Sequence, residues 1–269
     1  MALLGVFVAL MLTAVVRARE SANRTSCLNN LRQLAMAVHS YHDANNALPP
    51  YASMTPKYPV FGSWWIYLLP YVEQQSLYDK IAGSHAIASG GGTILIPPVQ
   101  QDGIRDARFG LLTCPSDPSH PGTDEGTTNY LANWYVLGDG VKGCYGPPRD
   151  FRDILDGFSN TVLFAEGYAE CNGTVRPALT DCGTHNFGIT PKYLPSDDPS
   201  YLPKDYTMFQ VRPSLQGPGR CSSLRTQTGH DHMPVALADG SARFLQPDIS
   251  PTLWKELLKP ADGKPAGGI

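Results

Sequence analysis

The chain has 269 residues with 21 basic and 24 acidic side chains, so its formal net charge is −3. A near-neutral chain lacks the concentrated basic face that nucleic-acid binding needs, and we therefore expect no nucleic-acid partner. Only 17% of the residues are charged, whereas 26 Gly and 24 Pro predict that much of the chain forms turns and loops. A polytopic membrane protein is excluded because only one stretch is continuously apolar.

That stretch is residues 2–16, ALLGVFVALMLTAVV, which carries no charge. It is shorter than the ~20 residues with which an α-helix crosses a bilayer, and it lacks the basic segment that opens a secretory signal peptide. We interpret it as a membrane anchor, or as part of the packed hydrophobic core of a filament. The side chains predicted to form this anchor are Leu3, Leu4, Val6, Phe7, Val8, Leu10, Leu12, Val15 and Val16.

The helical pattern continues beyond the apolar stretch. Apolar residues at positions 28, 31, 34, 35 and 38 follow one another at spacings of three and four, which indicates an amphipathic helix over residues 17–44. The pattern stops at Asn45-Asn46, shortly before Pro49-Pro50. We predict one continuous helix, with two helices broken near residues 17–21 as the alternative. The expected organisation is a helical region 1–48, a globular α+β domain 49–259 and a flexible tail 260–269.

The globular region contains few strong local patterns. Residues 61–81 are rich in aromatic side chains, and we predict that Trp64 and Trp65 belong to the core that covers the long helix, followed by a short helix over 73–81. Residues 83–110 read as a loop, 111–119 as a short strand running into a turn, and 127–138 as an extended segment. Residues 152–167 predict a hairpin or corner, with a turn at Asp156-Gly157 and a strand over 161–165. A last short helix is expected over 252–258.

The stretch HDHMPVALADGSARFL, residues 230–245, allows two interpretations. Asp239-Gly240 between two apolar runs predicts a β-hairpin, because both residues tolerate the positive φ of a two-residue turn. His230 and His232 could instead share a strand face and bind zinc with a third ligand from His185, Asp231 or Asp239. We favour the hairpin and expect no metal or cofactor. Because Ser159 also lacks a nucleophile elbow and an adjacent base, we do not expect an enzyme.

Six cysteines, Cys27, Cys114, Cys144, Cys171, Cys182 and Cys221, are scattered through this loop-rich chain. None forms a C-x-x-C pair, which argues against a zinc ribbon. The pattern fits disulfides formed in an oxidising compartment, with buried free thiols as the alternative. Cys171 and Cys182 lie close in sequence across a Gly-containing loop and are the pair that we expect to be bridged.

The motifs CLNNLRQLAMAVHSYHDANNALPP, LLPYVEQQSLY, CPSDP, TNY, DGFSNTVLFAE and ADGSARFL follow one another in this order. In this order they resemble the Planctomycetes family called domain of unknown function 1559, over about residues 2–258. The resemblance implies a pseudopilin-like α+β fold, in which a long N-terminal helix packs on an antiparallel sheet with long irregular loops. The family is also catalogued under a solute-binding-protein label, and no biochemical activity follows from membership. The motif positions, expected to be structural, are Cys114, Pro115, Asp117, Asp156, Gly157, Ser159, Asn160, His230, Asp239 and Gly240.

The sequence departs from the family pattern in two places. The family's prepilin-type leader, a basic segment that ends in Gly before Phe-Thr-Leu-Ile-Glu, is not found, so either the true start lies upstream or this copy has lost it. The family ends in His, nine residues and Asp-Gly, whereas eight residues separate His230 from Asp239 here. Arg17, Arg19 and Arg24 follow the apolar stretch, which alone would favour a cytoplasmic body. The cysteines and the family favour an exported one, in the periplasm or at the cell surface, and we adopt that expectation.

The leading expectation is a non-enzymatic, membrane-anchored pseudopilin-like protein. It would serve a type IV pilus or type II secretion-like assembly, or act as a cell-surface component, with other pilin-like proteins as homo- or hetero-oligomeric partners. The first alternative is a surface module that binds a solute or glycan through Trp64 and Trp65, or through Trp134 and Tyr135. The second is a metal-dependent hydrolase built on His230 and His232.

Overall fold

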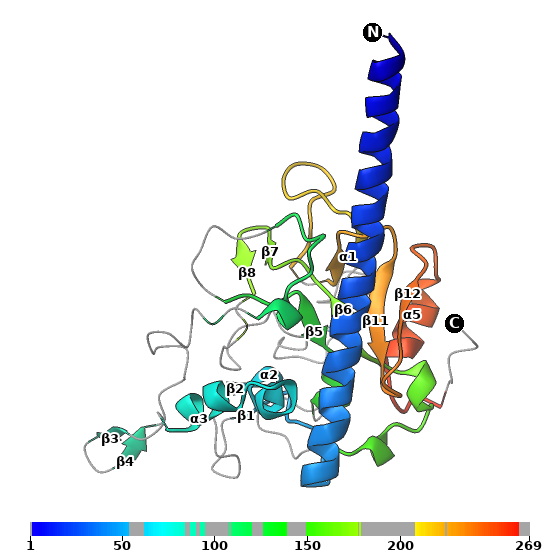
Figure 1. The fold of residues 1–269 in the computed structure, drawn as a ribbon. Helices are drawn as coiled ribbons and strands as arrows, with labels where there is room; N and C mark the ends of the chain where they lie inside the picture. The colour runs from blue at the N-terminus through cyan, green and yellow to red at the C-terminus, as the bar shows by residue number, and fades with distance from the viewer. Residues whose placement is uncertain are drawn as a thin grey trace.

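The structure is a computed structural model that describes residues 2–53, 62–83, 87–89, 92–94, 107, 109–119, 126–138, 149–176, 178, 208–223 and 225–263. Its dominant element is the helix α1, Ala2–Asn45. Figure 1 shows that the N-terminal half of α1 extends beyond the rest of the molecule, while its C-terminal half lies along the globular body. The predicted single helix, ending at Asn45, is confirmed.

The body is organised around a four-stranded sheet with the strand order β12-β11-β6-β5. Its strands are β5 Tyr130–Ala132, β6 Val162–Glu166, β11 Met233–Leu237 and β12 Ala242–Leu245. Every neighbouring pair is antiparallel, and the register shifts once between β11 and β6, after Ala236. The expected α+β fold, a long helix on an antiparallel sheet with irregular loops, is therefore confirmed.

The helix α1 covers one face of this sheet (Figure 1). Leu31, Leu34 and Val38 of α1 are fully buried in the core on this side of the sheet. The sheet contributes small side chains to the same core, among them Ala236 and Ala242. Small residues on the sheet let the helix backbone approach closely, so the amphipathic pattern of residues 17–44 is satisfied by this contact.

The opposite face of the sheet is covered by α5, Pro251–Leu258. Trp254 is buried there and meets the ring of Phe209 edge to face at 5.1 Å between centroids. Val235 and Leu237 belong to this second core, whereas Ala236 between them belongs to the core beneath α1. Alternate side chains of a strand point to opposite faces, and both faces are covered, which explains why β11 is apolar throughout.

The aromatic segment forms a compact group beside α1. It consists of β2 Gly62–Ser63, α2 Trp64–Leu68, the 3₁₀ helix η1 Leu69–Val72 and α3 Gln75–Gly83. Trp64 and Trp65 are each only 1% exposed, and Trp64 lies 4.9 Å from the ring of Phe164. Their predicted place in the core is confirmed. A surface platform made of these two rings is ruled out because neither presents a face to solvent.

In the part of the chain that the structure describes, four two-stranded pairs lie outside the main sheet. They join β1 Ala52–Ser53 with β2, β3 Ile87–Ser89 with β4 Gly92–Ile94, β7 Glu170–Cys171 with β8 Thr174–Val175, and β9 Gln210–Val211 with β10 Gln227–Thr228. The prediction of a plain loop over 83–110 is wrong where β3 and β4 pair. The prediction of an extended segment over 127–138 holds for β5 and is wrong for α4, Trp134–Leu137, which Asn133 caps.

Both predicted turns around the sheet are present, with different geometry. Residues 151–161 form a corner of two 3₁₀ helices, η4 Phe151–Asp153 and η5 Phe158–Asn160, rather than a hairpin. The β11–β12 hairpin is confirmed, but its turn is longer than predicted. Leu237 pairs with Ser241 across a three-residue loop, and only Gly240 has a positive φ, of 85°. This is the wider hairpin in which a glycine in the left-handed region closes the turn.

The cysteine pairing differs from the prediction. Cys171 is bridged to Cys221, not to Cys182, and a second disulfide joins Cys27 of α1 to Cys114. Proximity in sequence misled the prediction, because the bridges span 50 and 87 residues. Cys144 and Cys182 lie outside the described residues.

The described residues contain no helix that is both long enough and apolar enough to cross a membrane.

Candidate functional site

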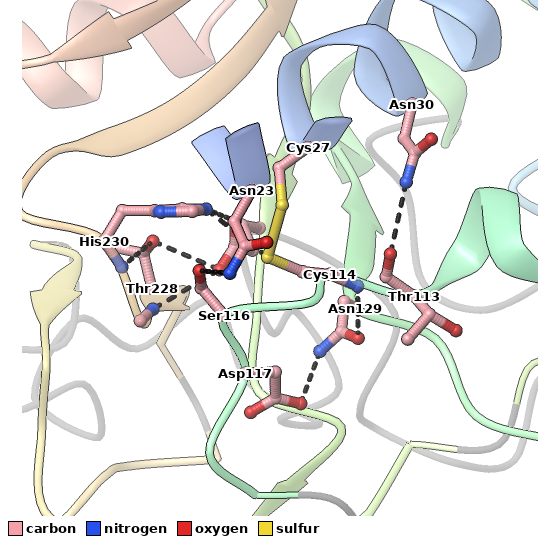
Figure 2. Close-up of a disulfide and its surroundings, with 12 residues drawn as sticks. Asn23, Cys27, Asn30, Thr113, Cys114, Ser116, Asp117, Asn129, Thr228 and His230 are labelled. Atoms are coloured by element: carbon pink, nitrogen blue, oxygen red, sulfur yellow. Dashed lines mark hydrogen bonds and ion pairs between the residues drawn. A yellow bond between two sulfur atoms is a disulfide. The ribbon is translucent and has the colours of Figure 1, made fainter. Parts of the chain in front are cut away.

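Several polar side chains are gathered where α1 leaves the body, and we call them the junction cluster. Figure 2 shows this region from close by, with the Cys27–Cys114 disulfide at its centre. Four stretches that are remote in sequence meet there, namely α1, the loop after η3 (Gly110–Leu112), the end of β6, and the segment from β10 to the start of β11. The members of the junction cluster are Glu20, Asn23, Cys27, Cys114, Ser116, Glu166, Thr228 and His230.

The first part of the junction cluster ties α1 to the body through Glu20. One carboxylate oxygen lies 2.6 Å from Nδ1 of His230, and the other accepts a 2.8 Å hydrogen bond from the Ser116 hydroxyl. Asn23, one turn further along the helix, donates to the same hydroxyl oxygen at 3.1 Å. The helix is therefore held by a polar network beside its disulfide, although Glu20 and His230 are 210 residues apart.

The second part lies deeper, around Glu166 at the end of β6. One of its carboxylate oxygens accepts hydrogen bonds from the Thr228 hydroxyl at 3.1 Å and from the backbone N–H of Gly229 at 3.4 Å. The other oxygen, Oε2, has no hydrogen-bond partner and lies 3.6 Å from Nε2 of His230. Glu166 is completely buried, so an oxygen without a donor is costly unless the group is protonated or bound to a cation.

The electrostatics of the junction cluster follow from burial and hydrogen bonding. Burial raises the pKa of Glu166 to about 8, and the hydrogen bonds from Thr228 and Gly229 only partly oppose the shift. Burial also lowers the pKa of His230 below its usual value, against the pull of Glu20. Burial disfavours the Glu20 anion, but the hydrogen bonds from His230 and Ser116 outweigh it and lower its pKa. Near neutral pH the cluster thus holds a neutral imidazole that donates through Nδ1 to the Glu20 carboxylate.

Asp117 organises the loop that presents Cys114 and Ser116. Its carboxylate accepts from the backbone N–H groups of Ser119 and Ala169, each at 2.9 Å, and from the side chain of Asn129. Asn129 in turn accepts a 2.9 Å hydrogen bond from the backbone N–H of Cys114. These contacts fit the structural role expected for Cys114 and Asp117, whereas the neighbouring Pro115 is exposed.

The other family motif, around Asp156, lies at the corner near the end of the chain. The Asp156 carboxylate accepts from the backbone N–H groups of Asp262 and Gly263 at 2.7 and 3.0 Å. Gly157 has φ of 99°, and Asn160 donates to the carbonyl of Asp156. Asp156, Gly157 and Asn160 therefore shape the corner and hold residues 262–263, and Ser159 is exposed on its surface.

The structure does not assemble the zinc site that was considered for His230 and His232. Both precede β11 in a bend, and His232 is outside the group of ligand atoms that surrounds His230. Asp231 forms an ion pair with Arg212 at 2.8 Å, and Asp239 accepts from the backbone N–H of Ser241 within the hairpin turn. His185 lies outside the described residues. Among the described residues, this combination of ligands therefore does not form.

Sequence reasoning missed Glu20 and Glu166, and it did not connect either cysteine of the Cys27–Cys114 bridge. The signal that was available was Glu20 itself, the one acidic residue among the first 42 of the chain, placed where the apolar stretch turns amphipathic. A carboxylate at that boundary faces either solvent or a specific partner. Its partner, His230, is part of a motif that was already recognised, but nothing local links the two.

A second region is a hollow beside the C-terminal end of α1, lined by His42, Asn46, Phe151, Arg152 and the neighbouring side chains Asp150, Ile154 and Phe158. His42 lies 3.7 Å from Asp150, which Arg152 also contacts at 2.9 Å. Its charged groups are thus paired with one another.

The Trp134 ring, considered above as a possible binding platform, is buried. The rings of Trp134 and Tyr51 meet edge to face at 4.5 Å between centroids, and Trp134 is 5% exposed, so this ring also does not form a surface platform.

Comparison with known families identifies the class of protein. Residues 16–252 match the family described as "Protein of unknown function (DUF1559)", which carries the label SBP_bac_10. The match covers most of the chain, and the protein belongs to this family. No curated protein and no solved structure shows significant similarity to it. The expected family is confirmed, and its label names solute binding without assigning an activity.

Proposed function

We propose that the protein is a non-enzymatic, membrane-anchored protein of pseudopilin-like organisation whose body lies outside the cytoplasm. It would act at the cell surface or as a component of a pilus-like or secretion-like assembly. The observation that carries this proposal is the projecting segment of α1, residues 2–19. Phe7, Met11, Leu12, Val15 and Val16 on this segment are each more than half exposed.

Exposed apolar side chains on a projecting helix favour insertion into an apolar phase. They lie in two rows with a spacing of four, Phe7-Met11-Val15 and Leu12-Val16, so a wide strip of the helix surface is apolar. Each large side chain contributes about 1.5–3 kcal/mol when it leaves water. The apolar residues 2–16 extend about 22 Å along the helix axis, and the long side chains of Arg17 and Arg19 can reach the lipid headgroups from that depth.

An exported body is supported by the two disulfides. Cys27–Cys114 and Cys171–Cys221 are both buried, and such bridges form and persist in oxidising compartments. A structural rather than enzymatic role is supported by the site itself. His230 is completely buried among the ionisable groups of the junction cluster, so a substrate has no access to it, and the charged groups beside His42 are paired with one another.

The proposal is tested by flotation of the purified full-length chain with lipid vesicles of phosphatidylethanolamine and phosphatidylglycerol. We expect the wild-type chain to float with the vesicles and Leu12→Glu/Val16→Glu to bind at least about tenfold more weakly, because buried charge is costly in lipid. Leu155→Glu is the matched control, since Leu155 is 77% exposed on the body, and it should float like the wild type.

Three outcomes would overturn the proposal. The first is a wild-type chain that remains in solution without detergent, and the second is a double variant that floats as well as the wild type. The third is a wild-type chain that binds no vesicles and forms an oligomer in solution that Leu12→Glu/Val16→Glu dissociates. In that case residues 2–19 would serve protein assembly rather than membrane attachment.

A further inference from the structure

Four side chains of the junction cluster form a compact set of metal ligands. Cys27, Cys114, Glu166 and His230 each offer one ligand atom, and these atoms all lie within 4.8 Å of one another. All four residues are completely buried. Two sulfurs, an imidazole nitrogen and a carboxylate oxygen are the donors that Zn²⁺ takes in proteins, usually four at a time and arranged as a tetrahedron.

The two disulfides found among the described cysteines differ in their surroundings. Cys171–Cys221 packs against Tyr168 in a small apolar cluster. Cys27–Cys114, by contrast, has His230 Nε2 at 3.4 Å from Cys114 Sγ (Figure 2). The buried Glu166 carboxylate belongs to the same group of ligand atoms. A bridge that serves only to tie two segments together gains nothing from a buried acid and an imidazole beside it.

The two distances from His230 Nε2 to its neighbouring ligand atoms match those of a tetrahedral zinc site. With zinc at about 2.3 Å from sulfur and about 2.0–2.1 Å from nitrogen and oxygen, neighbouring ligand atoms lie about 3.3–3.8 Å apart. In the structure His230 Nε2 is 3.4 Å from Cys114 Sγ and 3.6 Å from Glu166 Oε2. The two sulfurs are closer than this because they are bonded to each other, and the other pairs of ligand atoms lie within 4.8 Å.

Two further contacts prepare these ligands for a cation. Glu166 Oε2 is buried without a hydrogen-bond partner, which a metal ion would supply. Glu20 lies 2.6 Å from the other nitrogen of His230, Nδ1. That contact places the ring proton on Nδ1 and leaves the Nε2 lone pair directed at the cluster. A carboxylate behind a metal-binding histidine is the usual arrangement around zinc.

We propose that, once the Cys27–Cys114 bridge is reduced, Cys27 Sγ, Cys114 Sγ, His230 Nε2 and Glu166 Oε2 bind one Zn²⁺ ion. A dithiol reductant cleaves the S–S bond by supplying two electrons and two protons, and is itself oxidised to a disulfide. Binding of the ion then releases the two thiol protons and the carboxyl proton of Glu166 to solvent. In the reverse direction a disulfide oxidant takes two electrons from the thiolates and two protons from solvent and becomes a dithiol, while the bridge re-forms, Glu166 takes up its proton and the ion is displaced. The bridge and the ion are thus alternative ways of fastening α1 to the body.

The test uses the full-length chain, reduced without oxygen by a phosphine that is then removed, and titrated with Co²⁺ as a spectroscopic substitute for Zn²⁺. We expect one cobalt ion per chain, thiolate-to-cobalt charge-transfer absorption and the intense visible bands of a tetrahedral site. Zn²⁺ should displace the cobalt and abolish these bands. The unreduced chain is the control that needs no substitution, and it should show none of them.

Variants assign the site within the chain. Cys27→Ser/Cys114→Ser keeps the other four cysteines and should lose the charge-transfer absorption, whereas Cys171→Ser/Cys221→Ser should retain it. Glu166→Gln keeps an oxygen for the Thr228 and Gly229 hydrogen bonds and should weaken Zn²⁺ binding at least about tenfold. Glu20→Gln should weaken Zn²⁺ binding about 10–100-fold. Glu20 is not a ligand itself, so this effect would act through the orientation of the His230 ring.

The proposal fails if Cys27→Ser/Cys114→Ser binds cobalt as the wild type does, because the ion would then be held by other cysteines. It also fails if reduced wild-type chain binds no metal, or if Glu166→Gln and Glu20→Gln both bind as tightly as the wild type. The two glutamate variants keep the test decisive if the double cysteine variant does not fold. None of these outcomes depends on membrane attachment, so this inference and the proposed function stand or fall separately.

Discussion

His230 is the residue on which most of the junction cluster depends. It is completely buried between the Glu20 carboxylate on α1 and the unpartnered oxygen of Glu166, and its backbone N–H donates to the Thr228 hydroxyl. His232, two residues along, has an edge-to-face contact with Phe244 at 6.4 Å and is only partly buried. Removal of His230 would therefore disrupt a buried polar network, whereas removal of His232 would remove only a partly buried ring.

We expect His230→Ala to lower the free energy of unfolding by about 2–4 kcal/mol, because it removes the buried hydrogen-bond donor of the Glu20 carboxylate and leaves a cavity beside Glu166. His232→Ala should cost less than about 1 kcal/mol. Urea unfolding in the presence of detergent measures both. Equal effects for the two variants would show that the junction cluster does not hold the fold together.

Asp117 offers a second comparison between residues of the same type. Its carboxylate accepts four hydrogen bonds within the buried loop, from Ser119 N and Oγ, Asn129 Nδ2 and Ala169 N, whereas Asp231 is half exposed in a surface ion pair with Arg212. Asp117→Asn replaces one accepting oxygen by a donor and should cost about 2–3 kcal/mol. Asp231→Asn should cost about 0–1 kcal/mol. Thermal unfolding distinguishes them, and an Asp117→Asn variant as stable as Asp231→Asn would refute the role assigned to Asp117.

At the scale of elements, the packing of α1 on the sheet depends on small side chains. Ala236 of β11 is fully buried in the core beneath α1. Ala236→Leu should push the helix from the sheet and cost about 1–3 kcal/mol. Ala261→Leu, at an exposed position after α5, is the matched control and should be close to neutral. Amide hydrogen exchange along residues 31–38 should rise in Ala236→Leu alone, and unchanged exchange would contradict this packing.

The elements that could be predicted from sequence are those whose signals are local. The apolar spacing of Leu31, Leu34 and Val38 is enough to define α1, and Asp239-Gly240 is enough to define the hairpin, though not its three-residue loop. The junction cluster could not be predicted, because Glu20 and His230 are 210 residues apart and Cys27 and Cys114 are 87 apart. Contacts of that range depend on the complete tertiary fold. The same reason explains why Cys171 pairs with Cys221 rather than with the nearer Cys182.

At the scale of the whole molecule, the two halves of α1 lie in different environments, one against the sheet and one beyond the body. The C-terminal half of α1 packs against the sheet, and the N-terminal half, which extends beyond the body (Figure 1), carries five of the large exposed apolar side chains of α1, namely Phe7, Met11, Leu12, Val15 and Val16. The Cys27–Cys114 bridge lies close to that boundary and closes a loop of 87 residues, which is worth about 4–5 kcal/mol in chain entropy. A covalent link at this position keeps the body fixed to the helix when the projecting segment is held elsewhere.

The central claim is that this helix anchors an exported, disulfide-bridged body in the membrane. The most direct measurement is peptide mapping by mass spectrometry, without reduction, of the protein from the membrane and soluble fractions of its own cells. The account predicts that the protein is in the membrane fraction and that peptides containing Cys27 and Cys114 are linked, as are those containing Cys171 and Cys221. Protein found in the soluble fraction with these four thiols free would contradict it.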